Sequence, residues 1–309
     1  MKYCIVLDHR NFLPEPNRTQ VRDHQRLEEN PKNMKNEIDL REAINAVSDV
    51  VMNRPRPLRE FDQIYMKTGD MVLQSEVVAS WSDKKRLAYI GDGDAISVCV
   101  AYLKQRGIID YGPSRITVFD FDERIVQAIN RFADKERIEH LDAVLYNCLD
   151  EFPQIGRFDN FYTNPPWGAS NNGESVNVFA QRGMEATGYN GSGMIVIADD
   201  DELEWPKRVL GSTQNFASNS GYYVSRMMPK MHFYHLDDAP TLRSCNLIIS
   251  SLPGVQRDVR STPISDPDRL NNFYGRSKTP RVRYVKERKK LDYGKANEDE
   301  YLLELLEDQ

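Results

Sequence analysis

The sequence has few cysteines, no long apolar run and no excess of positive charge. Its 309 residues include four cysteines, none in a Cys-x-x-Cys pair, so reduced and mostly buried thiols are expected instead of disulfides. The apolar run Tyr3–Leu7 is too short for a signal peptide or a membrane span, and we expect it to be a strand of a cytoplasmic protein. A net charge of −6 excludes a global basic field that would recruit nucleic acid.

From Phe61 onward, strand patterns alternate with amphipathic helix patterns. The stretches Ala95–Arg106 and Glu123–Arg131 each follow a strand and place apolar residues on one helical face. Such alternation predicts an α/β protein with a mostly parallel, doubly wound sheet. The seven predicted strands are the run from Arg86 to the turn at Gly91, Arg115–Phe121, Ala143–Tyr146, Phe158–Thr163, Met194–Ala198, Tyr222–Met227 and Asn246–Ser251.

The fourth predicted strand, Phe158–Thr163, runs directly into Asn164-Pro165-Pro166-Trp167. The prolines end the strand because they fix φ and lack an N–H, which puts Asn164 at the carboxyl end, where open α/β sheets bind ligands. The Asn164 amide oxygen and a proline carbonyl can together accept from one NH2 group. Trp167 offers a flat face to a planar group and to positive charge developing on nitrogen. These four residues are therefore the predicted catalytic residues.

The turn after the first strand carries a second motif. Its two glycines allow close backbone approach and positive φ, and its two aspartates can receive an ammonium group. Asp120, at the end of the second strand, is placed to accept hydrogen bonds from ribose hydroxyls. After the third strand, Asn147 or Asp150 is a candidate adenine contact. The predicted cofactor-binding residues are thus Gly91, Asp92, Gly93, Asp94, Asp120, Asn147 and Asp150.

In this order the motifs resemble those of class I S-adenosylmethionine-dependent methyltransferases, and Asn-Pro-Pro-Trp resembles the catalytic motif of amino methyltransferases. The resemblance implies a Rossmann-like fold with a seven-stranded sheet and S-adenosylmethionine as cofactor. An NAD-binding Rossmann domain is the alternative, but its turn reads Gly-x-Gly-x-x-Gly, and Ile96 occupies the third glycine position here. No metal is expected, because a sulfonium leaving group is already activated and His232 and His235 would point to opposite faces of a strand.

Four stretches also resemble the branched-chain polyamine synthase family, which makes N4-bis(aminopropyl)spermidine on the same fold. The resemblance covers about residues 61 to 252 and has two departures. Gly93 replaces an aspartate of that family's glycine turn, and Asn164 replaces the aspartate that begins its strand-four motif. The resemblance implies that those acids bind or deprotonate polyamine. The matching stretches are Phe61–Gln63, Ile90–Asp94, Phe119–Arg124 and Phe179–Gly183.

The departures separate two reactions. An aliphatic amine has a pKa near ~10.4, as lysine does, so it must lose a proton to a base before it attacks. An aromatic amine or an amide is already neutral and needs hydrogen-bond acceptors instead. Asn164 suits the second task. We therefore expect N-methyl transfer to an exocyclic amine or amide of a nucleobase, a protein or a small molecule, with aminopropyl transfer from decarboxylated S-adenosylmethionine as the alternative.

An acidic stretch after the fifth strand supports the alternative. Asp199, Asp200 and Asp201 would lie at the same edge of the sheet and are predicted to bind a polycationic substrate. The alternative is a solvated acidic loop or a helix N-terminus, both of which are common. A cofactor-binding protein without turnover is a third hypothesis, against which the intact Asn-Pro-Pro-Trp motif argues.

Three segments are predicted: an N-terminal extension over residues 1–60, a catalytic domain over 61–255 and a tail over 256–309. The extension is expected to contain a strand, a polar arm and a helix at Asn36–Asn53. In the tail, the basic run Arg276–Lys290 is either a nucleic-acid contact or a solvated face. The acidic end carries four leucines, which we expect to dock as a short helix. If the two runs pair between protomers, the protein is a homo-oligomer. The leucines are Leu302, Leu303, Leu305 and Leu306.

Overall fold

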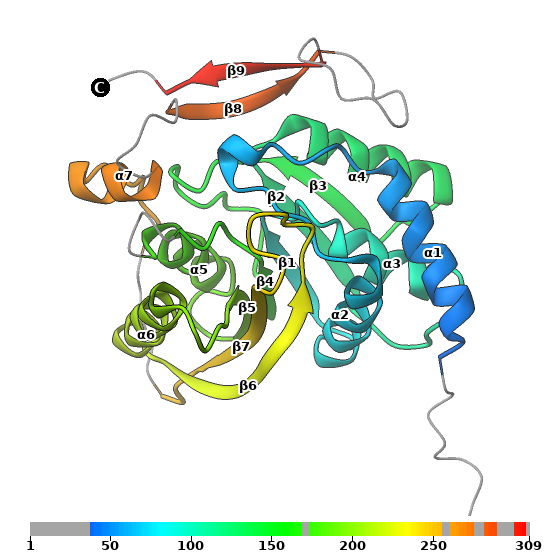
Figure 1. The fold of residues 1–309 in the computed structure, drawn as a ribbon, viewed down its shortest axis with the longest axis horizontal. Helices are drawn as coiled ribbons and strands as arrows, with labels where there is room; N and C mark the ends of the chain where they lie inside the picture. Colours follow the sequence, from blue (N-terminus) through cyan, green and yellow to red (C-terminus); the bar gives the residue numbers. More distant parts are fainter. Residues whose placement is uncertain (1–37, 169–172, 255–259, 275–280, 289–299, 307–309) are drawn as a thin grey trace, which may run out of the picture. The chain divides into compact units, whose positions relative to one another are not determined.

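The computed structural model describes residues 38–168, 173–254, 260–274, 281–288 and 300–306. Within these ranges, seven strands form one sheet in the order β3-β2-β1-β4-β5-β7-β6 (Figure 1). Strands β1 to β5 pair in parallel, whereas β7 is antiparallel to both of its neighbours. The predicted mostly parallel, doubly wound sheet is confirmed. The strands are β1 Arg86–Ile90, β2 Arg115–Asp120, β3 Leu141–Leu145, β4 Asn160–Thr163, β5 Ser192–Ala198, β6 Tyr222–Phe233 and β7 Arg243–Ser251.

Helices cover both faces of this sheet. Figure 1 shows α1 to α4 on one side and α5 and α6 on the other. The predicted helices after β1 and β2 are confirmed, and α4 is a turn longer than its apolar pattern indicated. The helices are α1 Leu40–Asn53, the 3₁₀ turn η2 Arg59–Phe61, α2 Thr68–Trp81, α3 Ile96–Gln105, α4 Glu123–Glu136, α5 Glu174–Ala186, α6 Glu204–Asn219 and α7 Pro267–Tyr274.

Helix α1 confirms the helix predicted at Asn36–Asn53 over the residues that the structure describes. Asp39 caps it by accepting hydrogen bonds from the N–H groups of Arg41 and Glu42. The buried face consists of two alanines and two valines, while Leu40 and Ile44 are exposed. The apolar pattern therefore located the helix, although two of its large apolar residues face solvent.

The packing of α5 on the sheet depends on one aromatic ring. The Phe161 side chain in β4 is fully buried between Gly183 of α5 and Gly193 of β5. A Cβ at either glycine would lie 2.1 Å from that ring, so any larger residue would push the helix or the neighbouring strand away. This contact fixes α5 beside the end of β4, where Asn164 begins the predicted catalytic motif.

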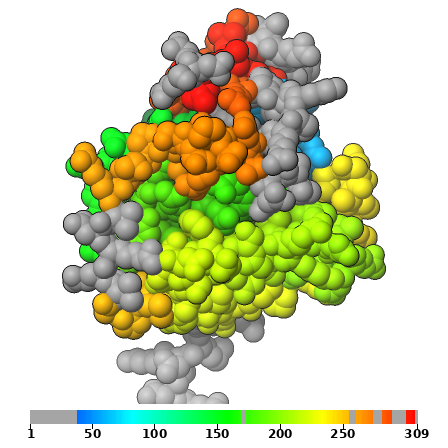
Figure 2. Space-filling view, turned by 90° about the vertical axis from the view of Figure 1, so that its left-hand side faces the viewer, coloured from blue at the N-terminus to red at the C-terminus, as the bar shows by residue number. Residues whose placement is uncertain are grey.

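Helix α7 lies on α5, as the orange and green residues in Figure 2 show. The Phe273 ring stacks on Phe179 of α5 with centroids 6.3 Å apart. Arg269 donates to Glu174 at 2.6 Å and to Gln181 at 3.1 Å. These contacts extend the wall that α5 forms at the edge of the sheet.

The acidic end of the chain is a strand and not the predicted helix. Strand β8, Val282–Glu287, pairs antiparallel with β9, Tyr301–Leu305. The acidic end is a strand because its backbone pairs with β8, and its side chains alternate between half-buried and exposed from Tyr301 to Glu304. In β8, Val282 and Val285 are buried on either side of an irregularity in the pairing, and the strand packs on α4. Arg131 of α4 holds Glu287 through two hydrogen bonds of 2.8 Å.

Several predictions fall partly or wholly outside the described ranges. The strand at Tyr3–Leu7, the polar arm after it and both ends of the basic run Arg276–Lys290 are among them. The segment boundaries at residues 60 and 255 stay predictions. No helix within the described ranges is long and apolar enough to cross a membrane.

Candidate active site

A cavity of about 600 Å³ opens at the carboxyl ends of β1, β2 and β4, which is a volume that suits a small-molecule ligand. Most of the predicted site residues line it together. They are Gly91, Asp92, Gly93, Asp94, Asp120, Asn147, Asn164, Pro165, Pro166 and Trp167.

The glycine turn brings the backbone close to the cavity. Gly91 has a φ of +72°, and a Cβ there would lie 2.9 Å from the Phe179 ring. Both the conformation and the space therefore require glycine. The Gly91 N–H donates to the Phe119 carbonyl at 2.8 Å, which ties the turn to the end of β2.

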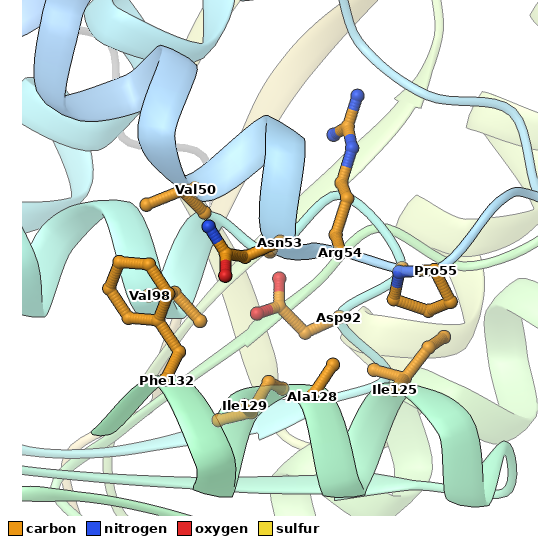
Figure 3. A pocket seen from close by; sticks show the side chains of 12 residues that line it. Val50, Asn53, Arg54, Pro55, Asp92, Val98, Ile125, Ala128, Ile129 and Phe132 are labelled. Atoms are coloured by element: carbon orange, nitrogen blue, oxygen red, sulfur yellow. The ribbon is translucent and has the colours of Figure 1, made fainter. Parts of the chain in front are cut away.

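The Asp92 side chain stabilises the start of helix α3. Its carboxylate accepts hydrogen bonds from the N–H groups of Ile96 and Ser97, both at 3.0 Å, at the start of α3. Burial raises the pKa of this carboxyl well above its usual range. Figure 3 shows the side chain facing Asn53 across a small cavity of about 10 Å³ between α1 and α4. Asp92 thus caps a helix, and its predicted contact with an ammonium group stays a prediction.

Asp120 is held by two backbone donors. Its two oxygens accept from the N–H groups of Asp92 and Asp122, each at 2.9 Å. Burial, with Asp122 beside it, raises the pKa of Asp120 to about 7. The carboxylate is fixed in orientation at the cavity wall, as a ribose contact requires.

Asp94 and Asn164 meet at the opposite end of the turn. The Asn164 amide donates to one Asp94 oxygen at 2.6 Å, and the Met66 N–H donates to the other at 2.6 Å. Arg54 lies 4.0 Å away and also donates to the Asp94 backbone carbonyl at 2.8 Å. Burial raises the pKa of Asp94, while the guanidinium of Arg54 opposes that effect. A carboxylate therefore lies beside Asn164, although the motif contains none.

The rest of the Asn-Pro-Pro-Trp motif is anchored by its neighbours. The Pro166 carbonyl accepts from the Ser175 hydroxyl at 2.6 Å. The Trp167 indole N–H donates to the Val196 carbonyl at 3.1 Å, and its ring meets Tyr234 edge-on with centroids 4.9 Å apart. Trp167 is nearly buried, so its orientation is set by packing before any ligand binds.

The Asn147 side chain, predicted to contact adenine, is hydrogen-bonded within the protein. Its amide donates to the Arg283 carbonyl of β8 at 2.6 Å, and its oxygen accepts from the Leu149 N–H at 2.8 Å. The residue lines the cavity, but these bonds join β3 to the C-terminal hairpin. An adenine contact from Asn147 stays a prediction.

Four predicted acids are not among the described lining residues. Asp150 accepts from Arg283 at 3.0 Å. Asp199 accepts from the Lys230 N–H, Asp200 from the N–H groups of Glu202 and Leu203, and Asp201 pairs with the Lys230 ammonium. Each carboxylate has a structural partner, so their predicted roles in cofactor and substrate binding gain no geometric support.

Other acids line the cavity instead. Glu60 and Asp62 come from η2 and the residue after it, and Asp238 from the loop after β6. These loop positions carry no periodic signal. Of the three, only Asp62 falls in a stretch, Phe61–Gln63, that the family resemblance singled out. Tyr65 and Tyr234, which also line the cavity, were missed for the same reason.

The two histidines considered as metal ligands are not paired. His232 is buried and bonds to Ser244 and Gln74, each at 2.8 Å, and burial lowers its pKa to about 4. Across the ranges that the structure describes, no group of three or more His, Cys, Asp or Glu side chains is arranged to hold a metal ion.

The family model of the branched-chain polyamine synthase A C-terminal domain matches residues 42–307. The chain belongs to this family. The match runs from α1 to the end of the described tail, beyond the stretch that the motifs alone covered. The prediction of a transferase is confirmed at the level of the family.

Curated relatives share part of this sequence. The N(4)-bis(aminopropyl)spermidine synthase of Thermococcus kodakarensis is 29% identical over 147 residues, which is 46% of this chain and 39% of that protein. The enzyme of the same name from Methanocaldococcus jannaschii is 26% identical over 157 residues, covering 50% and 41%. The chain therefore spans well under half the length of these relatives.

Solved structures confirm the fold. The branched-chain polyamine synthase of Thermus thermophilus, in complex with N4-aminopropylspermidine and 5'-methylthioadenosine, matches with a TM-score of 0.60 at 19% identity, covering 73% of this chain and 67% of that one. A putative RNA methyltransferase of Pyrococcus horikoshii matches with a TM-score of 0.51 at 14% identity, covering 69% and 98%. Both likenesses support a Rossmann-like class I methyltransferase fold.

Proposed function

We propose that the protein transfers an aminopropyl group from decarboxylated S-adenosylmethionine to an amine nitrogen of a polyamine. The observation that carries this proposal is the charge of the cavity. Six of its described lining side chains are acidic and one is basic. The acids are Glu60, Asp62, Asp92, Asp94, Asp120 and Asp238, and the base is Arg59.

This charge distribution suits a polycation and a donor without a carboxylate. Arg59 is an exposed residue whose guanidinium lies 3.6 Å from Asp238, so it is already matched by an acid. The α-carboxylate of S-adenosylmethionine would need a cationic or N–H partner. Decarboxylated S-adenosylmethionine carries only positive groups, which the acidic wall favours.

Asp94 supplies what Asn164 lacks. A polyamine nitrogen is protonated at neutral pH and needs a base before it attacks. The Asp94 carboxylate lies 2.6 Å from the Asn164 amide nitrogen, at the cavity wall, and burial raises its pKa. A raised pKa brings the group closer to the pH at which a general base works best. Asn164 is not a base, but Asp94 beside it can act as one, so the presence of Asn164 does not exclude aminopropyl transfer.

Separate residues of the chain would bind the donor, accept the proton and exclude water. When bound, the donor supplies a three-carbon amine on a sulfonium sulfur that leaves as a neutral thioether. Asp120 would hold the donor's ribose, and the glycine turn would allow its close approach. Asp94 would first take a proton from the acceptor ammonium, and the neutral nitrogen would then attack, forming the new carbon–nitrogen bond as the carbon–sulfur bond breaks. Trp167 and Tyr234 would exclude water from the reacting atoms.

The hypothesis of N-methyl transfer is not confirmed. It rested on Asn164, which can accept a hydrogen bond but is not a base, and the same cavity would have to admit a neutral nucleobase or amide. The assay described next therefore also tests for methyl transfer.

The test offers each donor separately with spermidine and with adenine-containing oligonucleotides, and identifies products by mass spectrometry. We expect a product larger by one aminopropyl group, formed only from decarboxylated S-adenosylmethionine and spermidine. A methylated product from S-adenosylmethionine would overturn the proposal.

A further inference from the structure

The guanidinium of Arg54 is buried next to the active-site cavity. Arg54 is the residue that ends α1, and its side chain is only 7% exposed. The side chain points away from Asp92 (Figure 3) and stacks on the Tyr65 ring, with its central carbon 4.1 Å from the ring centroid. Tyr65 lines the cavity, whereas Arg54 is not among the described lining residues. A buried cation is costly unless its partners replace the lost hydration, so these partners indicate what it does.

The polar partners of Arg54 lead to Asp94. The Nη1 atom donates to the Asp94 backbone carbonyl at 2.8 Å and lies 4.0 Å from the Asp94 carboxylate. The same nitrogen contacts the Met71 sulfur at 3.5 Å. Among the residues that the structure describes, Asp94 is the only one whose carboxylate lies within 4.0 Å of this guanidinium. The charge of Arg54 therefore acts first on the residue proposed as the base.

The surroundings of Asp94 otherwise favour its neutral form. The carboxyl is buried, and Asp92 in the same turn is a second buried acid; both conditions disfavour a negative charge. Burial raises the pKa of Asp94, and Arg54 is the strongest influence that opposes it. A neutral carboxyl could not take a proton from an ammonium group. The other titratable groups facing Asp94 are His235, which is exposed, and three tyrosines that burial keeps uncharged: Tyr65, Tyr162 and Tyr234.

Tyr65 holds the cation in place. Its hydroxyl donates to the Pro55 carbonyl at 2.9 Å, next to Arg54 in the sequence, and its own carbonyl accepts from the His235 N–H at 2.9 Å. A Cβ at Gly93 would lie 3.3 Å from the Tyr65 ring, so a side chain there would press on the ring on which the guanidinium rests. Glycine at position 93 thus leaves room for the Arg54–Tyr65 pair.

We propose that Arg54 is a positioning residue that keeps the Asp94 carboxylate ionised, and that Tyr65 holds Arg54 where it can do so. This inference rests on the proposed function, because it concerns the residue assigned there as the base. An opposite charge at about 4 Å lowers the pKa of a carboxyl by roughly 1 to 3. Arg54 therefore sets the lower pH limit of turnover, and α1 contributes to the active site.

The pH profile of turnover tests the role of Arg54. Arg54→Gln removes the charge and keeps a hydrogen-bond donor. We expect the acidic limb of the kcat profile to move up by about one pH unit or more, because Asp94 is protonated more easily without the cation. Above that limb, kcat should return to within about threefold of wild type. Arg54→Lys keeps the charge and should leave the limb within about half a pH unit.

An unmoved limb in Arg54→Gln, or the same movement in Arg54→Lys, would contradict the proposal. If the glutamine variant does not fold, Arg54→Met, which keeps an apolar stem against the Tyr65 ring, is measured in its place with the same expected result.

A double-mutant cycle tests the role of Tyr65. Tyr65→Leu removes the ring and should move the acidic limb in the same direction as Arg54→Gln, because the guanidinium is no longer held beside Asp94. In an Arg54→Gln background, Tyr65→Leu should move the limb no further, since the group that it holds is absent. A further movement of equal size would show that Tyr65 acts on Asp94 by another route and not through Arg54.

Arg131→Gln is the matched control. Arg131 donates two hydrogen bonds of 2.8 Å to Glu287 and is not among the described lining residues. Its replacement should lower the melting temperature and leave the acidic limb in place. His235→Gln, at the exposed second cation, should move the limb less than Arg54→Gln does. If Arg131→Gln moves the limb as far as Arg54→Gln, the movement reports lost stability and the proposal fails.

A second measurement does not depend on turnover. Carbon NMR of the aspartate carboxyls, with the Asp94 signal assigned through Asp94→Asn, follows the protonation of Asp94 directly. Its midpoint should lie at higher pH in Arg54→Gln than in wild type and Arg54→Lys. Equal midpoints would overturn the proposal. If the midpoints differ as expected while no aminopropyl transfer is detected, the proposed function fails and the effect of Arg54 on Asp94 stands.

Discussion

The part of the cavity proposed to bind the donor and the part proposed to bind the acceptor amine are built in different ways. The turn Gly91–Asp94 contributes residues to both, which are called here the donor end and the acceptor end. At the donor end, Gly91, Asp92 and Asp120 lie at adjacent strand ends: the Gly91 N–H donates to the Phe119 carbonyl, and the Asp92 N–H donates to the Asp120 carboxylate. At the acceptor end, Asp94 is held by Arg54, Met66 and Asn164, which come from three distant segments. The donor end follows from strand order, whereas the acceptor end exists only after tertiary packing.

The difference predicts which substitutions affect which step. Changes at the donor end should alter binding of the donor and its product. Changes at the acceptor end should alter turnover and leave donor binding in place.

The largest effect is expected for Asp94→Asn. The variant keeps the shape and the Met66 hydrogen bond but cannot take a proton. We expect kcat to fall roughly 100-fold or more, as for loss of a positioned general base. Steady-state kinetics with saturating substrates measure this, and calorimetry should show affinity for 5'-methylthioadenosine within about threefold of wild type.

Asn164→Asp is the matched variant. It places a second carboxylate beside Asp94, and the pair should share a proton. Activity should persist within about tenfold and shift with pH, because a dyad can still act as a base. If Asp94→Asn keeps full turnover while Asn164→Asp abolishes it, the assignment of the base is wrong.

The next largest effect is expected for Asp120→Asn at the donor end. Loss of a charged acceptor should weaken 5'-methylthioadenosine binding roughly 10-fold, measured by calorimetry. Turnover at saturating donor should fall less than about threefold. Asp142→Asn, at an exposed carboxylate on β3 that pairs with Arg115, should bind the ligand as wild type does. Equal affinity of Asp120→Asn and wild type would remove the ribose assignment.

Stability offers a second readout for Asp120. Its pKa is about 7 in the folded protein and about 3.9 when unfolded, so the folded state binds more protons between these values. Wild type should therefore lose stability as pH rises from about 4 to 7. Asp120→Asn should lack this loss, and the difference in melting temperature between the two should change across that range. A constant difference would show that Asp120 is ionised throughout.

The smallest effect concerns the exposed acids. Glu60 and Asp62 line the cavity, so replacing both with their amides should raise KM for the polyamine several-fold, on the order expected for exposed charge pairs. Asp201→Asn should leave that KM unchanged, because Asp201 pairs with Lys230 outside the described cavity wall. The reverse result would restore the predicted role of the acids after β5.

The sequence predicted the sheet, and it placed Gly91 and Asp120 at the sheet edge where the cavity opens. All seven strands of the sheet were located. Strands β1 to β5 pair in parallel and read as apolar runs with sharp ends at turns, whereas β6 is antiparallel and mostly exposed, and it runs to Phe233 instead of the predicted Met227. Gly91 and Asp120 followed from strand order alone, since the carboxyl ends of neighbouring parallel strands meet at one edge.

The acceptor end was predicted only in part. Asn164 lies in the cavity wall, as predicted, but its contact with Asp94 was not predicted, because strand order does not say which way a turn residue faces. The acids after β5 were chosen for their proximity to the sheet edge, yet local turns and Lys230 engage them. Strand β9 was mistaken for a helix, since its leucine pairs fit either period over so short a run.

The central claim is that an acidic cavity with Asp94 as base performs aminopropyl transfer. The most direct test mixes equal amounts of S-adenosylmethionine and decarboxylated S-adenosylmethionine with spermidine in one vessel and follows every product by mass spectrometry. Asp94→Asn serves as the blank. The account predicts that wild type forms aminopropylated spermidine and 5'-methylthioadenosine, that methylated products stay at the level of the blank, and that Asp94→Asn forms almost none of either. Methylated spermidine as the main wild-type product, or aminopropyl transfer undiminished in Asp94→Asn, would contradict it.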